Sequence, residues 1–290
     1  MSRETFPPSL AEPREERPPA PRDVAPLPIV RYGPEAAVPD EDWVAVEEPL
    51  EIRARGPGQV PVSVAVTMRT PGHDLELAVG FLFTEGLIRS RDELDLSARH
   101  LIHDGDIVRV ALNRPFDGEG LTRHFYATSS CGVCGKASLD KVAVICHPVG
   151  DGPVVGRSTI VGLPDALRSA QSGFDRTGGV HAAGLFDAEG GRIALREDVG
   201  RHNAVDKIVG RALLDGMVPL GGHILMVSGR TSFEILQKAA VAGVPIVCAV
   251  SAPSSLAVAV ADRLKITLVG FLRGSRFNVY THAHRIDPLR

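Results

Sequence analysis

The sequence predicts an α/β protein, with a smaller N-terminal α+β domain followed by a larger domain that has a mixed, partly parallel sheet and helices. The larger domain is indicated by apolar, strand-like runs between residues 223 and 272. These runs alternate with helical patterns of about 10–15 residues, as in βαβ units whose parallel strands are buried on both faces. The smaller domain is indicated by the alternating, Val- and Ile-rich residues 48–70, which are typical of a hairpin.

The first half combines a tail with the small domain. Residues 1–28 hold eight of the 22 prolines, and we expect a disordered tail there because such a segment buries too little apolar surface to offset its ordering entropy. After the hairpin, apolar residues recur at helical spacing over 73–88. Residues 106–112 and 122–128 indicate further strands, so the small α+β domain is expected to span 29–128.

The second domain is expected over residues 129–290 and opens with a loop that holds two cysteines. The segment 158–174 is expected to contain a helix, with Pro164 in its first turn, and two strands are expected around a turn at Gly190 and Gly191. The remaining expected elements are a helix over 203–216, strands over 223–229, 244–252 and 265–272 that alternate with helices over 231–243 and 254–264, and a last strand over 276–282.

Composition and charge exclude several classes of protein. The chain has 290 residues, 44% of them hydrophobic, and 32 Lys+Arg against 35 Asp+Glu give a net charge of −3. This balance argues against a nucleic-acid-binding protein, which carries a basic excess or stripe. No apolar run approaches the roughly 18 residues of a membrane span, and the N-terminus lacks the apolar stretch of a secretory signal. We therefore expect a cytoplasmic protein that binds neither nucleic acid nor a membrane.

The most informative motif is SSCGVCGK, which holds Cys131 and Cys134. Because only two residues separate the cysteines, both thiols lie on one tight turn. A thiolate that is close to an expected helix start and to Lys136 is expected to be nucleophilic at neutral pH. Two alternatives are half of a structural zinc site and a thioredoxin-type redox pair. Against zinc, Cys146 and Cys248 lie in apolar runs and are expected to be inert core thiols, so no metal site is predicted.

Two loops are candidates for anion binding because each follows an expected parallel strand and precedes a helix. In the first, Ser228 and Arg230 precede Thr231, which matches a capping box with Glu234. The second loop spans 251–255. Simple N-capping is the alternative for both loops.

A basic turn, FLRGSR, places Arg273 and Arg276 on either side of Gly274, just past an expected strand. Two guanidinium groups at a turn suit the recognition of phosphate or pyrophosphate. The alternative is an ordinary solvated, charged tail.

The segment REDVGRHNAVDK, residues 196–207, gathers polar groups at a helix start. These groups have either an acid–base role or a structural one, as a buried hydrogen-bond network. In GGVHAAG, the position two residues after His181 is Ala183 and not the glutamate that zinc nucleobase deaminases require, so deamination is excluded.

Six ordered blocks, namely SSCGVCGK, TGGVHAAG, REDVGRHNAVDK, SGRTSFEILQKAA, APSSLAVAVA and GFLRGSRFNVYTH, resemble the formate dehydrogenase accessory sulfurtransferases, the FdhD family. The resemblance covers roughly residues 30–290. It implies a cytidine-deaminase-like C-terminal domain that has lost deaminase chemistry, and a homodimer. It also implies sulfur transfer from a cysteine desulfurase to the molybdenum cofactor of formate dehydrogenase.

The resemblance also implies roles for individual residues. Cys131 corresponds to the cysteine that carries the persulfide, and Cys134 to the second cysteine, which either helps to release the sulfur or shields it. The protein has no cofactor of its own but binds the molybdenum bis(molybdopterin guanine dinucleotide) cofactor as the target of sulfuration. The implied binding segment comprises Phe271, Leu272, Arg273, Gly274, Ser275 and Arg276, and Ser228 and Arg230 are weaker candidates for the same ligand. A non-catalytic cofactor chaperone is the alternative.

Overall fold

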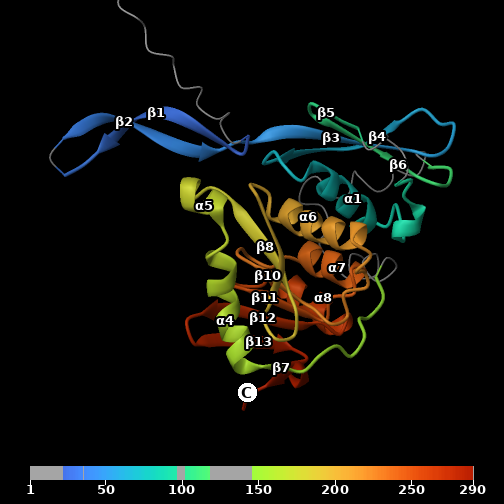
Figure 1. Cartoon of the computed structure of the whole chain (residues 1–290). Helices are drawn as coiled ribbons and strands as arrows, with labels where there is room; N and C mark the ends of the chain where they lie inside the picture. The colour runs from blue at the N-terminus through green and yellow to red at the C-terminus, as the bar shows by residue number, and fades with distance from the viewer. Residues whose placement is uncertain (1–21, 35, 97–101, 118–145, 290) are drawn as a thin grey trace, which may run out of the picture.

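The computed structural model describes residues 22–34, 36–96, 102–117 and 146–289 (Figure 1). Cys131, Cys134, the expected strand over 122–128 and residues 1–21 of the expected tail lie outside these ranges. Among the described residues, no helix is long and apolar enough to cross a membrane.

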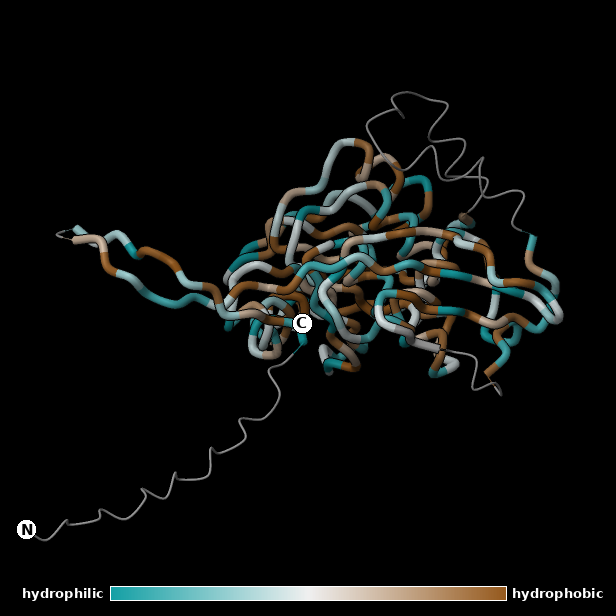
Figure 2. The backbone as a smooth tube through the Cα atoms, turned by 90° about the horizontal axis from the view of Figure 1, so that it is seen from above, coloured by the Kyte–Doolittle hydropathy of each residue, from teal (hydrophilic) through white to brown (hydrophobic). Residues whose placement is uncertain are grey.

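The first part of the chain forms a projecting hairpin and a four-stranded sheet. The hairpin strands pair antiparallel, and the sheet has the strand order β4-β3-β6-β5. The elements are β1 (Val24–Tyr32), β2 (Ala37–Ala45), β3 (Glu48–Arg55), β4 (Val62–Arg69), α1 (Asp74–Thr84), η1 (Arg91–Glu93), β5 (Ile102–Asp104) and β6 (Ile107–Ala111). Figure 2 shows the β1–β2 hairpin extending away from the body of the molecule.

Two expectations for this part are confirmed and one is wrong. The hairpin over 48–70 is confirmed as β3 and β4, and the helix over 73–88 is confirmed as α1, which ends at Thr84. The disordered tail expected over 1–28 is wrong for residues 24–28, which belong to β1. Because Pro26 and Pro28 lie in a strand that pairs on one side only, their missing N–H groups cost the hairpin little.

The second part is built on a six-stranded sheet of order β13-β12-β11-β10-β8-β9, in which β10, β11 and β12 are parallel and the other pairs antiparallel. The predicted partly parallel sheet is therefore confirmed. The elements are β7 (Val155–Gly156), α4 (Arg157–Arg168), α5 (Ser172–Thr177), β8 (His181–Phe186), β9 (Arg192–Asp198), α6 (Arg201–Leu214), β10 (Ile224–Val227), α7 (Phe233–Val241), β11 (Ile246–Ala249), α8 (Ser255–Arg263), β12 (Thr267–Arg273), β13 (Arg276–Thr281), η2 (Ala283–Arg285) and β14 (Ile286–Asp287).

The layers follow from the alternation of side chains along the strands. In β10, Leu225 and Val227 pack against α6, α7 and α8, whereas Ile224 and Met226 pack against α4 on the opposite face. Both faces of the strand are buried, which explains its uninterrupted apolar sequence. Helix α1 packs against α6 and joins the four-stranded sheet to the larger core (Figure 1).

One helix differs from its prediction. Pro164 lies well inside α4 and not in its first turn, because α4 begins at Arg157. The helix tolerates this proline on a partly exposed side and buries the opposite side through Ile160, Leu163 and Leu167. The cytidine-deaminase likeness of the larger domain stays a prediction.

Candidate functional site

The basic turn predicted at FLRGSR connects β12 to β13, and Gly274 takes a positive φ of 53° at its tip. Arg273 and Arg276 are direct cross-strand partners. Two like charges in this arrangement destabilise a hairpin. Among the described residues, no carboxylate lies within 4.0 Å of either guanidinium group. The turn is therefore a pair of uncompensated cations, an arrangement suited to an anionic ligand.

Phe271 precedes this pair in an unusual backbone conformation. Its φ is 52°, in the left-handed region, and its side chain is 44% exposed. The conformation accompanies an irregularity in the β12–β13 register between Gly270 and Arg273. A large non-glycine residue in this region is rare and marks a constrained site. Arg157, at the start of α4, donates from its guanidinium to the Ser275 carbonyl at 2.9 Å and brings a third cation to the turn, which the sequence did not reveal.

The two loops predicted at the carboxyl ends of parallel strands lie side by side. Thr231 and Pro253 form a bridge between them, and the Ser254 N–H donates to the Thr231 carbonyl at 3.1 Å. The Ser228 hydroxyl accepts the Ala182 N–H at 2.9 Å, so this side chain closes the end of the β8–β10 ladder.

The capping box predicted for Thr231 and Glu234 is wrong. The N-cap of α7 is Ser232, one residue later, and the Thr231 hydroxyl is buried without a hydrogen-bond partner. The Ser232 hydroxyl donates to the Glu234 carboxylate at 2.7 Å and also contacts His202 Nε2 at 3.1 Å. The backbone of Thr231 instead forms the bridge between the two loops, and this bridge fixes the backbone conformation of Thr231.

The structure brings three of the predicted ligand-binding residues to one cavity of about 560 Å³. Ser228, Leu272 and Arg273 line it, together with His181 from the start of β8. Gly178 and Gly179, which precede β8, and the α4–α5 segment form another part of the wall. The motif GGVHAAG does not indicate that His181 lines this cavity, because its place beside Ser228 depends on the antiparallel pairing of β8 with β10.

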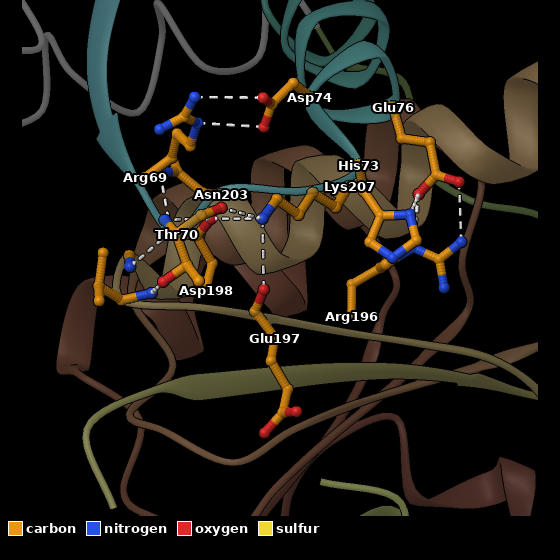
Figure 3. Close-up of polar contacts among 12 residues, drawn as sticks. Arg69, Thr70, His73, Asp74, Glu76, Arg196, Glu197, Asp198, Asn203 and Lys207 are labelled. Carbon is orange, nitrogen blue, oxygen red and sulfur yellow. Dashed lines mark hydrogen bonds and ion pairs between the residues drawn. The ribbon is translucent and has the colours of Figure 1, made fainter. Parts of the chain in front are cut away.

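The polar segment 196–207 separates into a buried part and a half-buried part. Asp198, Asn203 and Lys207 are buried and hydrogen-bonded (Figure 3). Lys207 Nζ lies 2.7 Å from the Asp198 carboxylate and donates to the Thr70 carbonyl at 2.9 Å. This network ties α6 to the end of β4, as the structural alternative predicted.

The same close-up contains two further ion pairs (Figure 3). Arg69 bonds both carboxylate oxygens of Asp74, and Arg196 bonds both oxygens of Glu76, at 2.5 and 2.8 Å. Although burial acts to raise the pKa of Glu76, the hydrogen bonds from Arg196 and His73 lower this pKa to about 2. Arg201 and His202 take no part in these contacts and are half-buried near the carboxyl end of β10.

The two cysteines predicted to be inert are confirmed as buried. Burial raises the pKa of the Cys146 thiol to about 12 and also raises that of Cys248, so both stay protonated. Within the described ranges, no group of three or more His, Cys, Asp or Glu side chains is placed to hold a metal ion.

A sequence model of the FdhD/NarQ family matches residues 45–287 of the chain. The chain is 51% identical over 259 residues to the sulfur carrier protein FdhD of Mycobacterium tuberculosis, a match that covers 84% of this chain and 92% of the relative. It is 43% identical over 259 residues to the sulfur carrier protein FdhD of Saccharolobus solfataricus, covering 89% and 96%.

A solved structure is also similar. The crystal structure of a proposed formate dehydrogenase accessory protein from Desulfotalea psychrophila superimposes with a TM-score of 0.70 at 26% sequence identity. The superposition covers 91% of this chain and 99% of that one. The sequence and the fold therefore agree on one set of relatives.

Proposed function

Because the chain belongs to the FdhD/NarQ family, we propose that it is a sulfur carrier that acts in the maturation of formate dehydrogenase. Relatives that share about half of its residues are sulfur carrier proteins. The similar crystal structure is that of a proposed formate dehydrogenase accessory protein. The observation in this structure that best supports the proposal is the uncompensated Arg273–Arg276 pair, which suits the phosphate groups of a nucleotide-bearing cofactor.

The first chemical step loads the sulfur. The Cys131 thiolate attacks the terminal sulfur of a persulfide on a cysteine desulfurase. A new S–S bond forms between Cys131 Sγ and that sulfur, and the S–S bond to the desulfurase cysteine breaks, with this cysteine leaving as a thiolate. No net oxidation occurs, because the sulfane sulfur moves between two thiolates. Of the four cysteines, Cys146 and Cys248 are excluded from this role by their burial and raised pKa.

The second step delivers the sulfur to the molybdenum bis(molybdopterin guanine dinucleotide) cofactor, which is the substrate. In one role, Cys134 attacks Cys131 Sγ, and the outer sulfur leaves as sulfide while a Cys131–Cys134 disulfide forms. A cellular dithiol then reduces the disulfide before the next round. In the other role, Cys134 shields the persulfide and the acceptor supplies the two electrons that convert sulfane sulfur to sulfide.

The proposed binding site for that cofactor is the β12–β13 turn and the cavity beside it. Arg273 and Arg276 hold a pyrophosphate group, and the exposed ring of Phe271 is presented beside them by its constrained backbone. Ser228 and Arg273 border the same cavity, which gives the ligand a concave surface. Ser228 itself acts through the backbone of Ala182, so we assign it a positioning role.

The proposed partners are a cysteine desulfurase, formate dehydrogenase and a second copy of the chain, in the cytoplasm. Support for a homodimer comes from the β1–β2 hairpin. Its register places Pro26 opposite Trp43 and Val30 opposite Pro39 on one face, which is apolar except for Glu41 opposite Pro28. Trp43 and Val30 are 39% and 56% exposed. A hairpin is marginally stable alone in water, so this face is suited to packing on a partner. A monomeric mass in light scattering would contradict the dimer.

The decisive experiment measures the persulfide directly. The full chain is incubated with a cysteine desulfurase and cysteine, and its intact mass is recorded before and after reduction. We expect a reducible adduct of one sulfur atom that is lost in Cys131→Ala and kept in Cys146→Ala, the matched control. If Cys131→Ser still supports active formate dehydrogenase in cells, the protein is a cofactor chaperone and not a sulfur carrier. Removable stoichiometric zinc would favour the metal alternative, and catalytic reduction of a protein disulfide would favour the redox alternative.

A further inference from the structure

A second group of basic side chains lies at the carboxyl end of β10, which β11 separates from β12 and its turn. Val227, the last residue of β10, pairs with Ala183 of β8, and the Ser228 N–H donates to the Ala182 carbonyl at 3.0 Å. This register places His181 beside Gly229, where a Cβ atom would lie 3.1 Å from His181 Nδ1. Gly229 therefore leaves room for the imidazole at the start of the β10–α7 loop.

Arg230 follows in that loop, and Arg201 and His202 come from the first turn of α6. The pKa of His181 is lowered by its burial and also by the positive charges of Arg201, His202 and Arg230. These four side chains, His181, Arg201, His202 and Arg230, are called the β10 basic cluster below. His181 lies against Gly229, and His202 Nε2 lies 3.1 Å from the Ser232 hydroxyl, so the cluster gathers along the β10–α7 loop.

The cluster has more positive charge than its surroundings neutralise. Among the described residues, no carboxylate lies within 4.0 Å of the Arg201 or Arg230 guanidinium group. Glu234 is the acidic partner of the cluster, 3.3 Å from His202 Nε2, and its hydrogen bond with His202 lowers its pKa to about 2. Within the described part of the chain, both arginines therefore lack an ion-pair partner.

Two buried donors at this place also lack partners. Arg201 Nε is inaccessible to solvent and makes no hydrogen bond to the residues that the structure describes. The Thr231 hydroxyl, next to Arg230 and 1% exposed, makes none either. Buried polar atoms are almost always satisfied in native proteins, and each exception needs an explanation such as a bound ligand. Helix α6 begins here after Gly200 with no acidic residue in its first turn, so α6 itself brings no negative charge to the site.

We propose that Arg201 and Arg230, assisted by His181 and His202, form a second anion site that takes a phosphate or pyrophosphate group. The site is distinct from the Arg273–Arg276 turn, but His181 and Arg273 border the same cavity of about 560 Å³. Of the four residues of the β10 basic cluster, only His181 lines this cavity, so the two sites adjoin at His181. This inference rests on the proposed function, because the cofactor named there carries two pyrophosphate groups, one for each site.

The test is the stoichiometry of inorganic pyrophosphate binding to the full chain, measured by isothermal titration calorimetry. We expect two sites in the wild type and one in R201Q/R230Q. Loss of two charge-assisted contacts lowers the affinity of the second site by roughly a hundredfold or more. The R273Q/R276Q variant is expected to keep the site that R201Q/R230Q loses. Arg89→Gln, which removes an exposed arginine elsewhere, is the matched control and retains both sites.

The outcomes separate this inference from the proposed function. Wild-type stoichiometry and affinity in R201Q/R230Q overturn the second site and leave sulfur carriage untouched. A single site that is lost only in R273Q/R276Q overturns it as well. A single site that is lost only in R201Q/R230Q supports the β10 basic cluster and removes the turn from the proposed function. Because Arg201 is half-buried, R230Q alone is measured too, since Arg230 is exposed and its loss leaves packing intact.

A further experiment identifies which molecule supplies the phosphate or pyrophosphate group. Protein purified from cells is denatured and oxidised, and the fluorescence of released pterin is compared between the wild type and R201Q/R230Q. A lower pterin content in the variant assigns the site to the cofactor. An unchanged pterin content together with lost pyrophosphate binding assigns it to a free nucleotide.

Discussion

Gly80 of α1 and Gly210 of α6 face each other where the two helices cross. A Cβ atom on Gly80 would lie 2.8 Å from the backbone nitrogen of Gly210, and a Cβ on Gly210 would lie 2.7 Å from the backbone nitrogen of Gly80. The two helices therefore touch backbone to backbone. This contact joins the four-stranded sheet to the larger domain, because α1 follows β4 directly and α6 covers the six-stranded sheet.

The crossing makes Gly210→Ala strongly destabilising. The added methyl group overlaps the α1 backbone, which a helix can relieve only by moving, and we expect the free energy of unfolding to fall by about 3 kcal/mol or more. Gly162→Ala is the control, because Gly162 lies inside α4 with open space around it, and there alanine raises stability by up to about 1 kcal/mol. Urea unfolding of both variants measures the difference. Equal stabilities would contradict the close crossing.

The stability of the protein depends on pH through Glu76. The pKa of its carboxyl is lowered to about 2 from an ordinary 4.5, so the charged form is favoured in the folded state. The contribution of this carboxylate to the free energy of unfolding is complete above pH 4.5 and is lost as the pH falls from 4.5 toward 2. The shift corresponds to about 3 kcal/mol. Urea unfolding across this window is expected to show a loss that is larger in the wild type than in Glu76→Gln, which keeps only the loss due to Glu234 and other groups. An equal loss in both would assign the acid sensitivity to groups other than Glu76.

Lys207 and Asp198 form a buried ion pair whose members depend on each other. Both side chains are at most 1% exposed. Lys207→Met leaves the Asp198 carboxylate buried and unpaired, and we expect a loss of about 3–5 kcal/mol in unfolding free energy. The double variant Asp198→Asn, Lys207→Met recovers part of the loss, because no buried charge remains. A double-mutant cycle from urea unfolding gives the coupling, and additive effects would contradict it.

The parallel strands could be predicted from the sequence, and the β1–β2 hairpin could not. Strands β10 and β11 are buried on both faces, so their sequences are apolar throughout and easily distinguished from the helices between them. Strands β1 and β2 bury almost nothing, and Pro26, Pro28 and Pro39 are residues that usually argue against a strand. Sequence patterns report burial, so an exposed element gives a weak signal.

The candidate site, too, could be predicted only in the part that a local sequence pattern reveals. Arg273 and Arg276 were predicted because both lie in one short turn. His181 and Arg201 meet at the end of β10 only through strand register and helix placement, which short-range spacing does not contain. Within residues 196–207, no pattern separated the buried Lys207 from the half-buried Arg201, since both belong to the same polar run.

The Arg273–Arg276 pair is expected to bind the anionic cofactor but to lower the free energy of unfolding of the protein slightly. Because the two guanidinium groups are direct cross-strand partners with no carboxylate of the described residues within 4.0 Å, their repulsion is unrelieved when no anion is bound. We expect R273Q/R276Q to keep the wild-type free energy of unfolding or to raise it by about 0.2–1 kcal/mol. The same variant is expected to lose the activation of formate dehydrogenase in cells, while still accepting sulfur on Cys131 in the intact-mass assay. Lysine at both positions keeps the charge but not the planar fork, so R273K/R276K should activate weakly. A clear drop in the stability of R273Q/R276Q would instead assign the two arginines a structural role.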